Sequence, residues 1–293
     1  MRAGVLNVIK PTGATSFAVV KRLRDLSGAH RVGHAGTLDP LATGVLPVLF
    51  ESATRLSDYA HRLPKTYEAD VHFGLTTDTD DAEGERHPVA DASGLTAAAV
   101  TGALRLFVGR ISQEPPAFSA VKVDGERSYR RARKGDLERP AARLVEVYSA
   151  ELLGFTPGAE AVAQVRVVCG SGTYLRALAR DLGAALRVGG YLGKLVRTAY
   201  GPLRIEEGVE VGALETSADL EARLLPSEVV LPEMSAVKLT LEQEAQVRQG
   251  RPVRVLPEPA PGPLRAHGVE GRLVALGHTD PLRRTFVPEK VLN

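Results

Sequence analysis

The stretch Gly33-His34-Ala35-Gly36-Thr37-Leu38-Asp39-Pro40-Leu41-Ala42-Thr43-Gly44 decides how the chain around it is arranged. Three glycines and one proline within twelve residues are incompatible with a helix or a regular strand. We therefore expect a shaped loop, followed by an apolar strand at residues 45–50. The loop offers one carboxylate, Asp39, and one imidazole, His34. From the residues alone, Asp39 either takes part in chemistry or caps a neighbouring amide in a turn.

Apolar periodicity on both sides of this loop predicts a mixture of helices and strands. The helix before the loop would be capped by Ser16 and ended by Gly28. The clearest strand covers residues 66–74, where apolar residues such as Tyr67 alternate with polar residues such as Glu68. Further strands are expected at residues 6–9, 144–155 and 161–168, and further helices at residues 52–63, 96–107 and from residue 173.

The composition changes near residues 225–234, where Pro226 and Pro232 flank a short apolar run that looks like a linker. Beyond it we expect a strand at residues 237–239, a helix at 241–249, a proline-rich hairpin or loop at 252–264, and strands near Leu273 and Phe286. The chain is thus predicted to hold an α+β domain over residues 1–230 and a small, mostly β domain over residues 235–293. With 293 residues, 44% of them hydrophobic, it can supply a core for each.

Cysteine content and hydropathy indicate where the protein works. The single cysteine, Cys169, rules out an internal disulfide and leaves a Cys-based zinc site without a second thiol, so we expect it to be buried and unreactive. The first residues lack the features of a signal peptide, and no run of about 18 apolar residues is present. We therefore expect a cytoplasmic protein that does not enter the membrane.

Charge is balanced over the whole chain but not locally. Thirty-seven basic and 35 acidic side chains give a net charge of +2, which by itself does not indicate a nucleic-acid binder. Between Lys122 and Arg143, however, eight basic residues face four acidic ones, with Tyr129 among them. This pattern suits a loop and short helix along a phosphate backbone, although a solvated helical face explains the charge equally well.

Several common catalytic motifs are missing. The one Gly-Lys pair, Gly193-Lys194, is followed by Leu195, so no phosphate-binding loop of the Walker type is present. The run that begins at Gly170 lacks the third glycine of a dinucleotide fingerprint, and neither His-Glu-x-x-His nor Gly-x-Ser-x-Gly occurs. Nucleotide hydrolysis, hydride transfer, zinc proteolysis and serine esterase chemistry therefore lack their usual residues.

The pattern Gly-His-x-Gly-x-Leu-Asp-Pro-x-Ala-x-Gly resembles the signature loop of the TruB family of tRNA pseudouridine synthases, in which the Asp is catalytic. Other segments resemble motifs of the same family in the same order: Lys10-Pro-Thr-Gly-Ala-Thr-Ser16, Lys65-Thr-Tyr67, Thr77 to Gly84, Gln113 to Arg127, Gly172-Thr-Tyr-Leu-Arg176 and Leu195-Val-Arg-Thr198. The resemblance covers roughly residues 5–230. The chain after about residue 235 looks like the PUA-type RNA-binding module of the family.

The resemblance implies both a fold and an activity. The fold would be a mixed, largely antiparallel sheet with flanking helices and a central cleft, an RNA-binding thumb insertion at about residues 113–143, and a PUA-like domain at residues 235–293. The activity would be that of an isomerase that flips uridine 55 out of the T-loop of tRNA and converts it to pseudouridine. The partner would be the T-stem-loop of tRNA, bound by a monomer without a guide RNA. No step of this reaction requires a metal or an organic cofactor.

Site residues follow from the same resemblance. Asp39 would be the nucleophile or electrostatic partner, and Arg176 would pair with it and keep it ionised in a desolvated pocket. Tyr67 would stack on the uracil, with Leu195 closing its other face. Tyr174 would hydrogen-bond to the base or take its C5 proton. From the residues alone, core packing is the favoured interpretation of Tyr67, and a surface position on a helix is the alternative for Arg176.

The remaining candidates would contact RNA. His34 would hold the flipped nucleotide or its phosphate, unless it is a structural histidine, and Lys10 would be a positioning charge. In the thumb, the candidates for phosphate binding are Lys122, Arg130, Arg131 and Arg133. A protein with the same RNA-binding residues could instead be a PUA-containing tRNA chaperone without chemistry, in which Asp39 would be dispensable.

Overall fold

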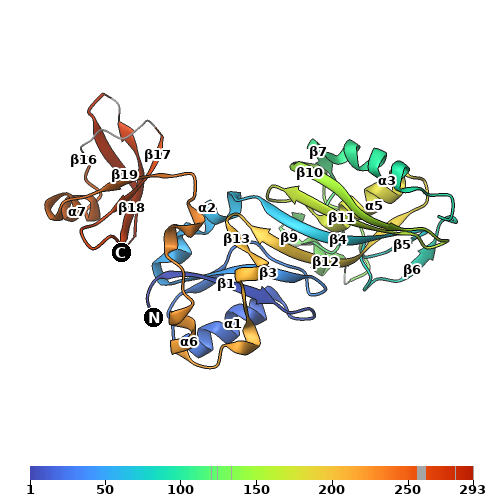
Figure 1. Ribbon diagram of the computed structural model, residues 1–293, viewed down its shortest axis with the longest axis horizontal. Helices are drawn as coiled ribbons and strands as arrows, with labels where there is room; N and C mark the ends of the chain where they lie inside the picture. The colour runs from blue at the N-terminus through green and yellow to red at the C-terminus, as the bar shows by residue number, and fades with distance from the viewer. Residues whose placement is uncertain (120, 124, 133, 256–261, 281, 293) are drawn as a thin grey trace.

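The computed structural model describes residues 1–293 except residues 120, 124, 133, 256–261, 281 and 293. Figure 1 shows an elongated body built on one long sheet, with a smaller β unit at the C-terminal end. The helices of the described residues are α1 Ser16–Ser27, α2 Ser57–Arg62, α3 Ala97–Leu104, α4 Ser128–Ala132, α5 Leu175–Ala185, α6 Ser217–Ala222 and α7 Leu241–Arg248.

The body is organised by a 10-stranded sheet in the order β14-β1-β3-β12-β4-β11-β10-β7, with β13 beside β12 and β2 beside β3. Its strands are β1 Gly4–Lys10, β2 Val32–His34, β3 Thr43–Phe50, β4 Lys65–Phe73, β7 Gly109–Gln113, β10 Arg143–Thr156, β11 Val162–Cys169, β12 Gly190–Tyr200, β13 Leu203–Arg204 and β14 Val209–Glu210. Within this sheet, as far as the structure describes it, the pairs β1 with β14 and β12 with β3 are parallel and the others antiparallel. The predicted mixed, largely antiparallel sheet with flanking helices is confirmed.

Two short hairpins lie outside this sheet. One pairs β5 Leu75–Thr77 with β6 Arg86–Pro88, and the other pairs β8 Lys122–Val123 with β9 Glu126–Arg127 within the thumb. The first hairpin encloses the acidic loop at residues 78–85.

The core lies between the sheet and its helices. In β4 the predicted alternation is confirmed, because every second residue from Lys65 to Phe73 is buried. Leu178 and Leu182 of α5 belong to the same buried cluster as the apolar side chains of β4 and β11. At the other end of the sheet, α1 packs its apolar side chains against β1 and β3.

The start of α1 differs from the sequence prediction. Thr15, not Ser16, is the N-cap, because the Thr15 hydroxyl accepts the backbone N–H of Ala18 at 3.0 Å. Ser16 faces inward, where its hydroxyl accepts the Leu38 N–H at 2.9 Å and donates to the Leu38 carbonyl at 3.1 Å. The predicted stop at Gly28 is confirmed, since this residue has φ 63° in the left-handed region that glycine adopts readily.

The structure also differs from the sequence prediction at residues 51–62 and 190–200. The helix expected at residues 52–63 begins as a 3₁₀ helix, Glu51–Leu56, and becomes α-helical only in α2. The central strand β12 was not predicted, because glycines and the charged residues Lys194 and Arg197 interrupt its apolar pattern. Its pairing with both β3 and β4 explains why it is a strand nonetheless.

The C-terminal unit is a five-stranded sheet in the order β15-β17-β18-β19-β16, with α7 packed against it and a buried core of its own. Its strands are β15 Ser235–Lys238, β16 Val253–Arg254, β17 Pro263–His267, β18 Leu273–Asp280 and β19 Thr285–Val291. The strands near Leu273 and Phe286 are confirmed, whereas β17 lies largely beyond the proline-rich loop expected at 252–264. The unit contacts the body where Lys290 donates to the Arg55 carbonyl at 2.9 Å.

Among the described residues, no helix is both long and apolar enough to span a lipid bilayer.

Cys169 is buried at the end of β11, as predicted, with 1% of its surface exposed. Burial raises the pKa of its thiol from about 9 to about 11, which lowers the thiolate fraction at pH 8 by about 10²-fold. We therefore expect the folded protein to react with Ellman's reagent at least about 10²-fold more slowly than the chain in guanidinium chloride. The denatured protein, which should release one equivalent of thionitrobenzoate, is the control. Rapid stoichiometric labelling of the folded protein would contradict this prediction.

Candidate active site

The Asp39 loop, residues 35–42, connects β2 to β3 and is hydrogen-bonded to the end of β1 and the segment that follows it. The Lys10 ammonium donates to the carbonyls of Pro11 at 2.9 Å, Ala14 at 2.7 Å and Pro40 at 3.3 Å. Gly13 also donates its N–H to the Pro40 carbonyl at 2.7 Å. Lys10 is fully buried, and burial lowers its pKa to about 8. The charge of Lys10 is thus surrounded by backbone carbonyls, one of them from the Asp39 loop, a position suited to shaping the loop.

Arg197 of β12 is a second buried cation that binds this loop. It is 1% exposed, and its guanidinium donates to the carbonyls of Val45 at 2.6 Å and Gly36 at 3.1 Å. The same guanidinium lies 5.0 Å from the centre of the Tyr200 ring and 6.0 Å from that of Tyr67. Arg197 lies in a segment that resembles a family motif, but the sequence alone assigns it no role. A buried arginine that binds loop carbonyls has no local sequence signal, because its partners lie about 150 residues away.

The Asp39 carboxylate lies at the surface of this loop, with 36% of its side chain exposed, and contacts Arg176 of α5. The Nε atom of Arg176 is 3.0 Å from Oδ2 of Asp39. Within the part of the chain that the structure describes, no backbone N–H donates a hydrogen bond to this carboxylate. The contacts of Asp39 therefore favour the ion pair over the capping interpretation.

Arg176 is 6% exposed at its side chain, so its interpretation as a surface residue is wrong. Besides Asp39, it contacts the acidic loop, where Nη1 lies 3.5 Å from the Asp81 carboxylate and donates to the Thr79 carbonyl at 3.2 Å. Its Nη2 donates to the Phe118 carbonyl of the thumb at 2.9 Å. Each nitrogen of the guanidinium thus faces a different segment of the chain, which fixes its orientation toward Asp39.

The acidic loop contributes residues that sequence analysis missed. Asp80 and Asp81 are each 3% exposed, and burial raises the pKa of both carboxyls. Asp80 pairs with Arg180 of α5 at 2.9 Å and with Arg139 of the thumb at 3.2 Å. The sequence held one signal for these pairs. Arg176 and Arg180 are four residues apart, so they share one face of the predicted helix and could meet two adjacent acids.

Tyr67 and Leu195 lie next to the Asp39 loop. They project from the neighbouring strands β4 and β12 and belong to the same buried cluster as Leu38 of the loop. The Tyr67 hydroxyl is 3.5 Å from the Arg197 guanidinium, and burial raises the pKa of the phenol. With 9% of its surface exposed, Tyr67 contributes to the core and also borders the site.

Tyr174 precedes α5 as its N-cap residue. Burial, followed by the nearby Asp39 carboxylate, raises the pKa of its hydroxyl, so the phenol is protonated at neutral pH. His34 is half-buried at the end of β2, and burial, followed by the Arg197 and His61 charges, lowers its pKa. Its imidazole is therefore neutral near pH 7.

The basic residues expected to bind phosphate lie in the thumb, between β7 and β10. Arg130 is exposed, whereas Arg131 pairs with Asp136 at 2.7 Å and Glu138 at 2.9 Å. Arg133 and the side chain of Lys122 lie outside the described residues. Part of the positive charge of this stretch is thus balanced within the thumb itself.

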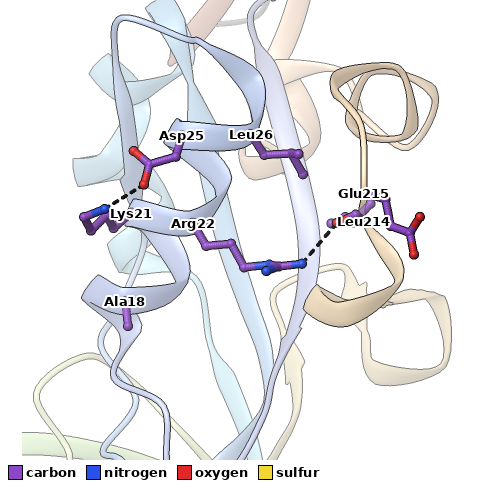
Figure 2. A pocket seen from close by; sticks show the side chains of 7 residues that line it. All are labelled: Ala18, Lys21, Arg22, Asp25, Leu26, Leu214 and Glu215. Carbon is purple, nitrogen blue, oxygen red and sulfur yellow. Dashed lines mark hydrogen bonds and ion pairs between the residues drawn. The ribbon is translucent and has the colours of Figure 1, made fainter.

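A groove with a volume of about 730 Å³ lies away from these residues. Figure 2 shows its lining of Ala18, Lys21, Arg22, Asp25, Leu26, Leu214 and Glu215. Arg22 donates to the Leu214 carbonyl at 3.3 Å, and Lys21 pairs with Asp25 at 2.7 Å. The first contact joins α1 to the segment before α6, whereas the second lies within α1, and neither involves a residue predicted for catalysis.

Comparisons with solved structures support the fold. The chain is 23% identical, with a TM-score of 0.70, to a protein in a structure described as an H/ACA RNP bound to a substrate RNA containing 2′-deoxyuridine. It is 25% identical, with a TM-score of 0.69, to one in a Cbf5–Nop10–Gar1 complex. Each alignment covers 99% of this chain and 85% of the other.

Comparisons of sequence identify the family. Residues 24–175 match the family described as TruB family pseudouridylate synthase, N-terminal domain. The chain is 46% identical to tRNA pseudouridine synthase B of Symbiobacterium thermophilum, over 84% of this chain and 82% of the relative. It is 43% identical to the protein of the same name from Thermobifida fusca, over 94% of both chains. With Asp39 in the signature loop and paired with a buried arginine, this chain belongs to the TruB family of pseudouridylate synthases.

Proposed function

We propose that this protein converts uridine 55 in the T-loop of tRNA to pseudouridine, with Asp39 as the catalytic carboxylate. The relatives named above are tRNA pseudouridine synthases, which places this chain among the isomerases. The observation that carries the assignment is the pair of Asp39 and Arg176, in which a partly exposed carboxylate contacts a buried guanidinium at 3.0 Å.

The reaction breaks the bond between N1 of uracil and C1′ of ribose, turns the free base, and joins it again through C5. The uridine must leave its stacked position before an enzyme can reach it. Arg176 contacts Oδ2 of Asp39 and supplies an opposite charge, so the other oxygen, Oδ1, is left for the reaction. Because Arg176 is held on its other sides by Asp81 and by backbone carbonyls, its charge is already oriented when the RNA arrives.

The residues around Asp39 supply the remaining functions of the pocket. Tyr67 stacks on the flipped uracil, and Leu195 closes the other face of the ring. Tyr174 donates a hydrogen bond to the base, since its raised pKa keeps the hydroxyl protonated before the reaction. His34, neutral at the end of β2, contacts the nucleotide where it leaves the T-loop.

RNA binding extends over a larger surface than the pocket. In this proposal residues 1–230 form the catalytic domain, the thumb at about residues 113–143 covers the T-stem-loop, and residues 235–293 form a PUA-like RNA-binding domain. Support comes from the position of the thumb next to the site. Its Arg139 pairs with Asp80 of the acidic loop, and its Phe118 carbonyl accepts a hydrogen bond from Arg176, the partner of Asp39.

The proposed substrate can be tested with two RNAs, an unmodified tRNA transcript and the isolated T-stem-loop hairpin. Incubation with the purified protein, without a guide RNA, should give pseudouridine at position 55 of both. Mapping by carbodiimide modification and primer extension measures the product. Modification at another position, or only after a guide RNA is added, would contradict the proposal.

Arg176→Lys is expected to lower the rate of modification by about 10²-fold. Lysine keeps the charge but cannot contact three segments at once, so Asp39 is no longer held in one orientation. The measurement is the single-turnover rate with enzyme in excess over the T-stem-loop. Lys21→Arg, a change of the same kind in α1, is the control and should keep the full rate. A wild-type rate for Arg176→Lys would show that charge alone is sufficient.

Arg130→Gln is expected to weaken tRNA binding and to reduce the slope of log Kd against log salt concentration by about 1. Arg130 is exposed in α4, so its charge is free to meet a phosphate when the thumb covers the RNA. The measurement is filter binding at salt concentrations from about 50 to about 300 mM. Lys21→Gln removes an exposed charge from α1 and should leave the slope unchanged. Equal slopes for the wild type and Arg130→Gln would show that this side chain faces solvent.

A further inference from the structure

Gln113 is a buried amide with a specific pair of partners. It is the last residue of β7, at the start of the thumb, and only 2% of its surface is exposed. Its Oε1 accepts the backbone N–H of Tyr174 at 2.9 Å, and its Nε2 donates to the backbone carbonyl of the same residue at 3.2 Å. The side chain thus binds both polar groups of one peptide residue, as a neighbouring strand would.

These two bonds fix the start of α5. Tyr174 is the N-cap residue of the helix, and its own side chain makes no capping bond. Its carbonyl already accepts the first helical N–H, from Leu178 at 3.0 Å, so Gln113 supplies the additional contacts that set its backbone. Because Tyr174 and Arg176 both belong to this first turn, the direction of each side chain depends on where Gln113 holds the chain.

The segment that follows Gln113 lies along the same helix. The Glu114 carbonyl accepts Nη2 of Arg180 at 3.0 Å, and the Phe118 carbonyl accepts Nη2 of Arg176 at 2.9 Å. The first residues of the thumb are therefore bound to the first two turns of α5. We call these first thumb residues, 113–118, the thumb root. A shift of the thumb root would move the Phe118 carbonyl, which accepts a hydrogen bond from Arg176, the partner of Asp39.

We infer that Gln113 is a positioning residue for pseudouridine formation, which sets Tyr174 and Arg176 relative to Asp39 and joins this geometry to the thumb root. The inference rests on the proposed function. Gln113 does not contact the reacting atoms and acts through the backbone of Tyr174. If Gln113 were purely structural, its substitution would lower the amount of folded protein. If it is a positioning residue, its substitution lowers the rate constant of pseudouridine formation in each enzyme–RNA complex.

The test uses Gln113→Leu, which keeps the volume and removes both hydrogen bonds, and Gln113→Asn, which keeps an amide too short to reach both groups. Single-turnover rates on the T-stem-loop are measured with enzyme in saturating excess, beside Kd by filter binding. Asp219→Ala is the matched control, because the Asp219 carboxylate also accepts two backbone N–H groups at a helix start, from Glu215 at 3.1 Å and Thr216 at 2.8 Å.

For both Gln113 variants we expect the rate constant to fall between about 10-fold and 10²-fold, while Kd changes by less than about threefold. Asp219→Ala should lower the melting temperature and keep the wild-type rate constant. Wild-type rate constants in Gln113→Asn, or a loss confined to the amplitude of the reaction, would overturn the inference. If the wild-type protein itself forms no pseudouridine, the proposed function has failed instead, and the two results are separate.

Discussion

Asp39→Asn is expected to abolish pseudouridine formation, with a loss of about 10⁴-fold or more in the single-turnover rate. Asparagine has nearly the same shape, so the loop should keep its fold. The amide carries no charge, and it cannot serve as a nucleophile or as the partner of a developing positive charge. The ion pair with Arg176 is lost as well, which leaves a buried guanidinium next to a neutral group.

Binding should be affected far less than the rate, because most contacts with tRNA lie outside this carboxylate. Asp25→Asn, an exposed carboxylate of α1, is the control and should keep the full rate. The two variants are compared by mapping pseudouridine in a tRNA transcript and by measuring Kd. Equal product from wild type and Asp39→Asn would remove the catalytic assignment. No product from either, with tRNA bound by both, would favour a tRNA chaperone without chemistry.

Gly44→Ala is expected to cause the largest loss of stability among single substitutions in the signature loop, about 3 kcal/mol or more. Gly44 has φ +107°, a conformation that other residues rarely adopt. A Cβ atom there would lie 2.3 Å from the carbonyl oxygen and 2.8 Å from the nitrogen of Arg197. Both are backbone atoms of β12, so no side-chain rotation can relieve the overlap.

Gly44 and Arg197 are also register partners in the parallel pairing of β3 with β12. Separating these strands would withdraw the Arg197 guanidinium from the loop carbonyls, so activity should fall with stability. Urea unfolding followed by circular dichroism measures the loss. Gly33→Ala is the matched control, since a Cβ at Gly33 meets nothing within 4 Å, and it should cost less than about 0.5 kcal/mol. Equal stability of the two variants would contradict the close approach of β3 and β12.

The local elements were predictable where one face of the chain is buried. The alternation in β4 and the helical stripe of α5 record which side chains face the core, and both are confirmed. The glycine stop at Gly28 followed from the left-handed geometry that ends a helix. The prediction of β12 failed because a strand in the middle of a sheet is stabilised by neighbours on both sides, whatever its own pattern.

The candidate site was predictable in part. The resemblance of the signature loop pointed to Asp39, and that of the segment Gly172 to Arg176 pointed to Arg176; the structure brings these two residues together at 3.0 Å. Their supports, among them Asp81 and Gln113, could not be assigned roles from the sequence, because each acts on a residue far away in the chain.

The sequence by itself determined the kind of loop that carries Asp39, because glycine and proline act on the backbone locally. The motif in this loop also indicated the family. Only the tertiary structure decided what surrounds that loop. The sheet order β3-β12-β4 places Arg197 against the loop carbonyls, and the start of α5 meets the acidic loop and the thumb root at Arg176. The physical reason is that buried charges and amides take partners according to which segments meet in space, and pairwise contacts across about 100 residues leave no periodic trace in the chain.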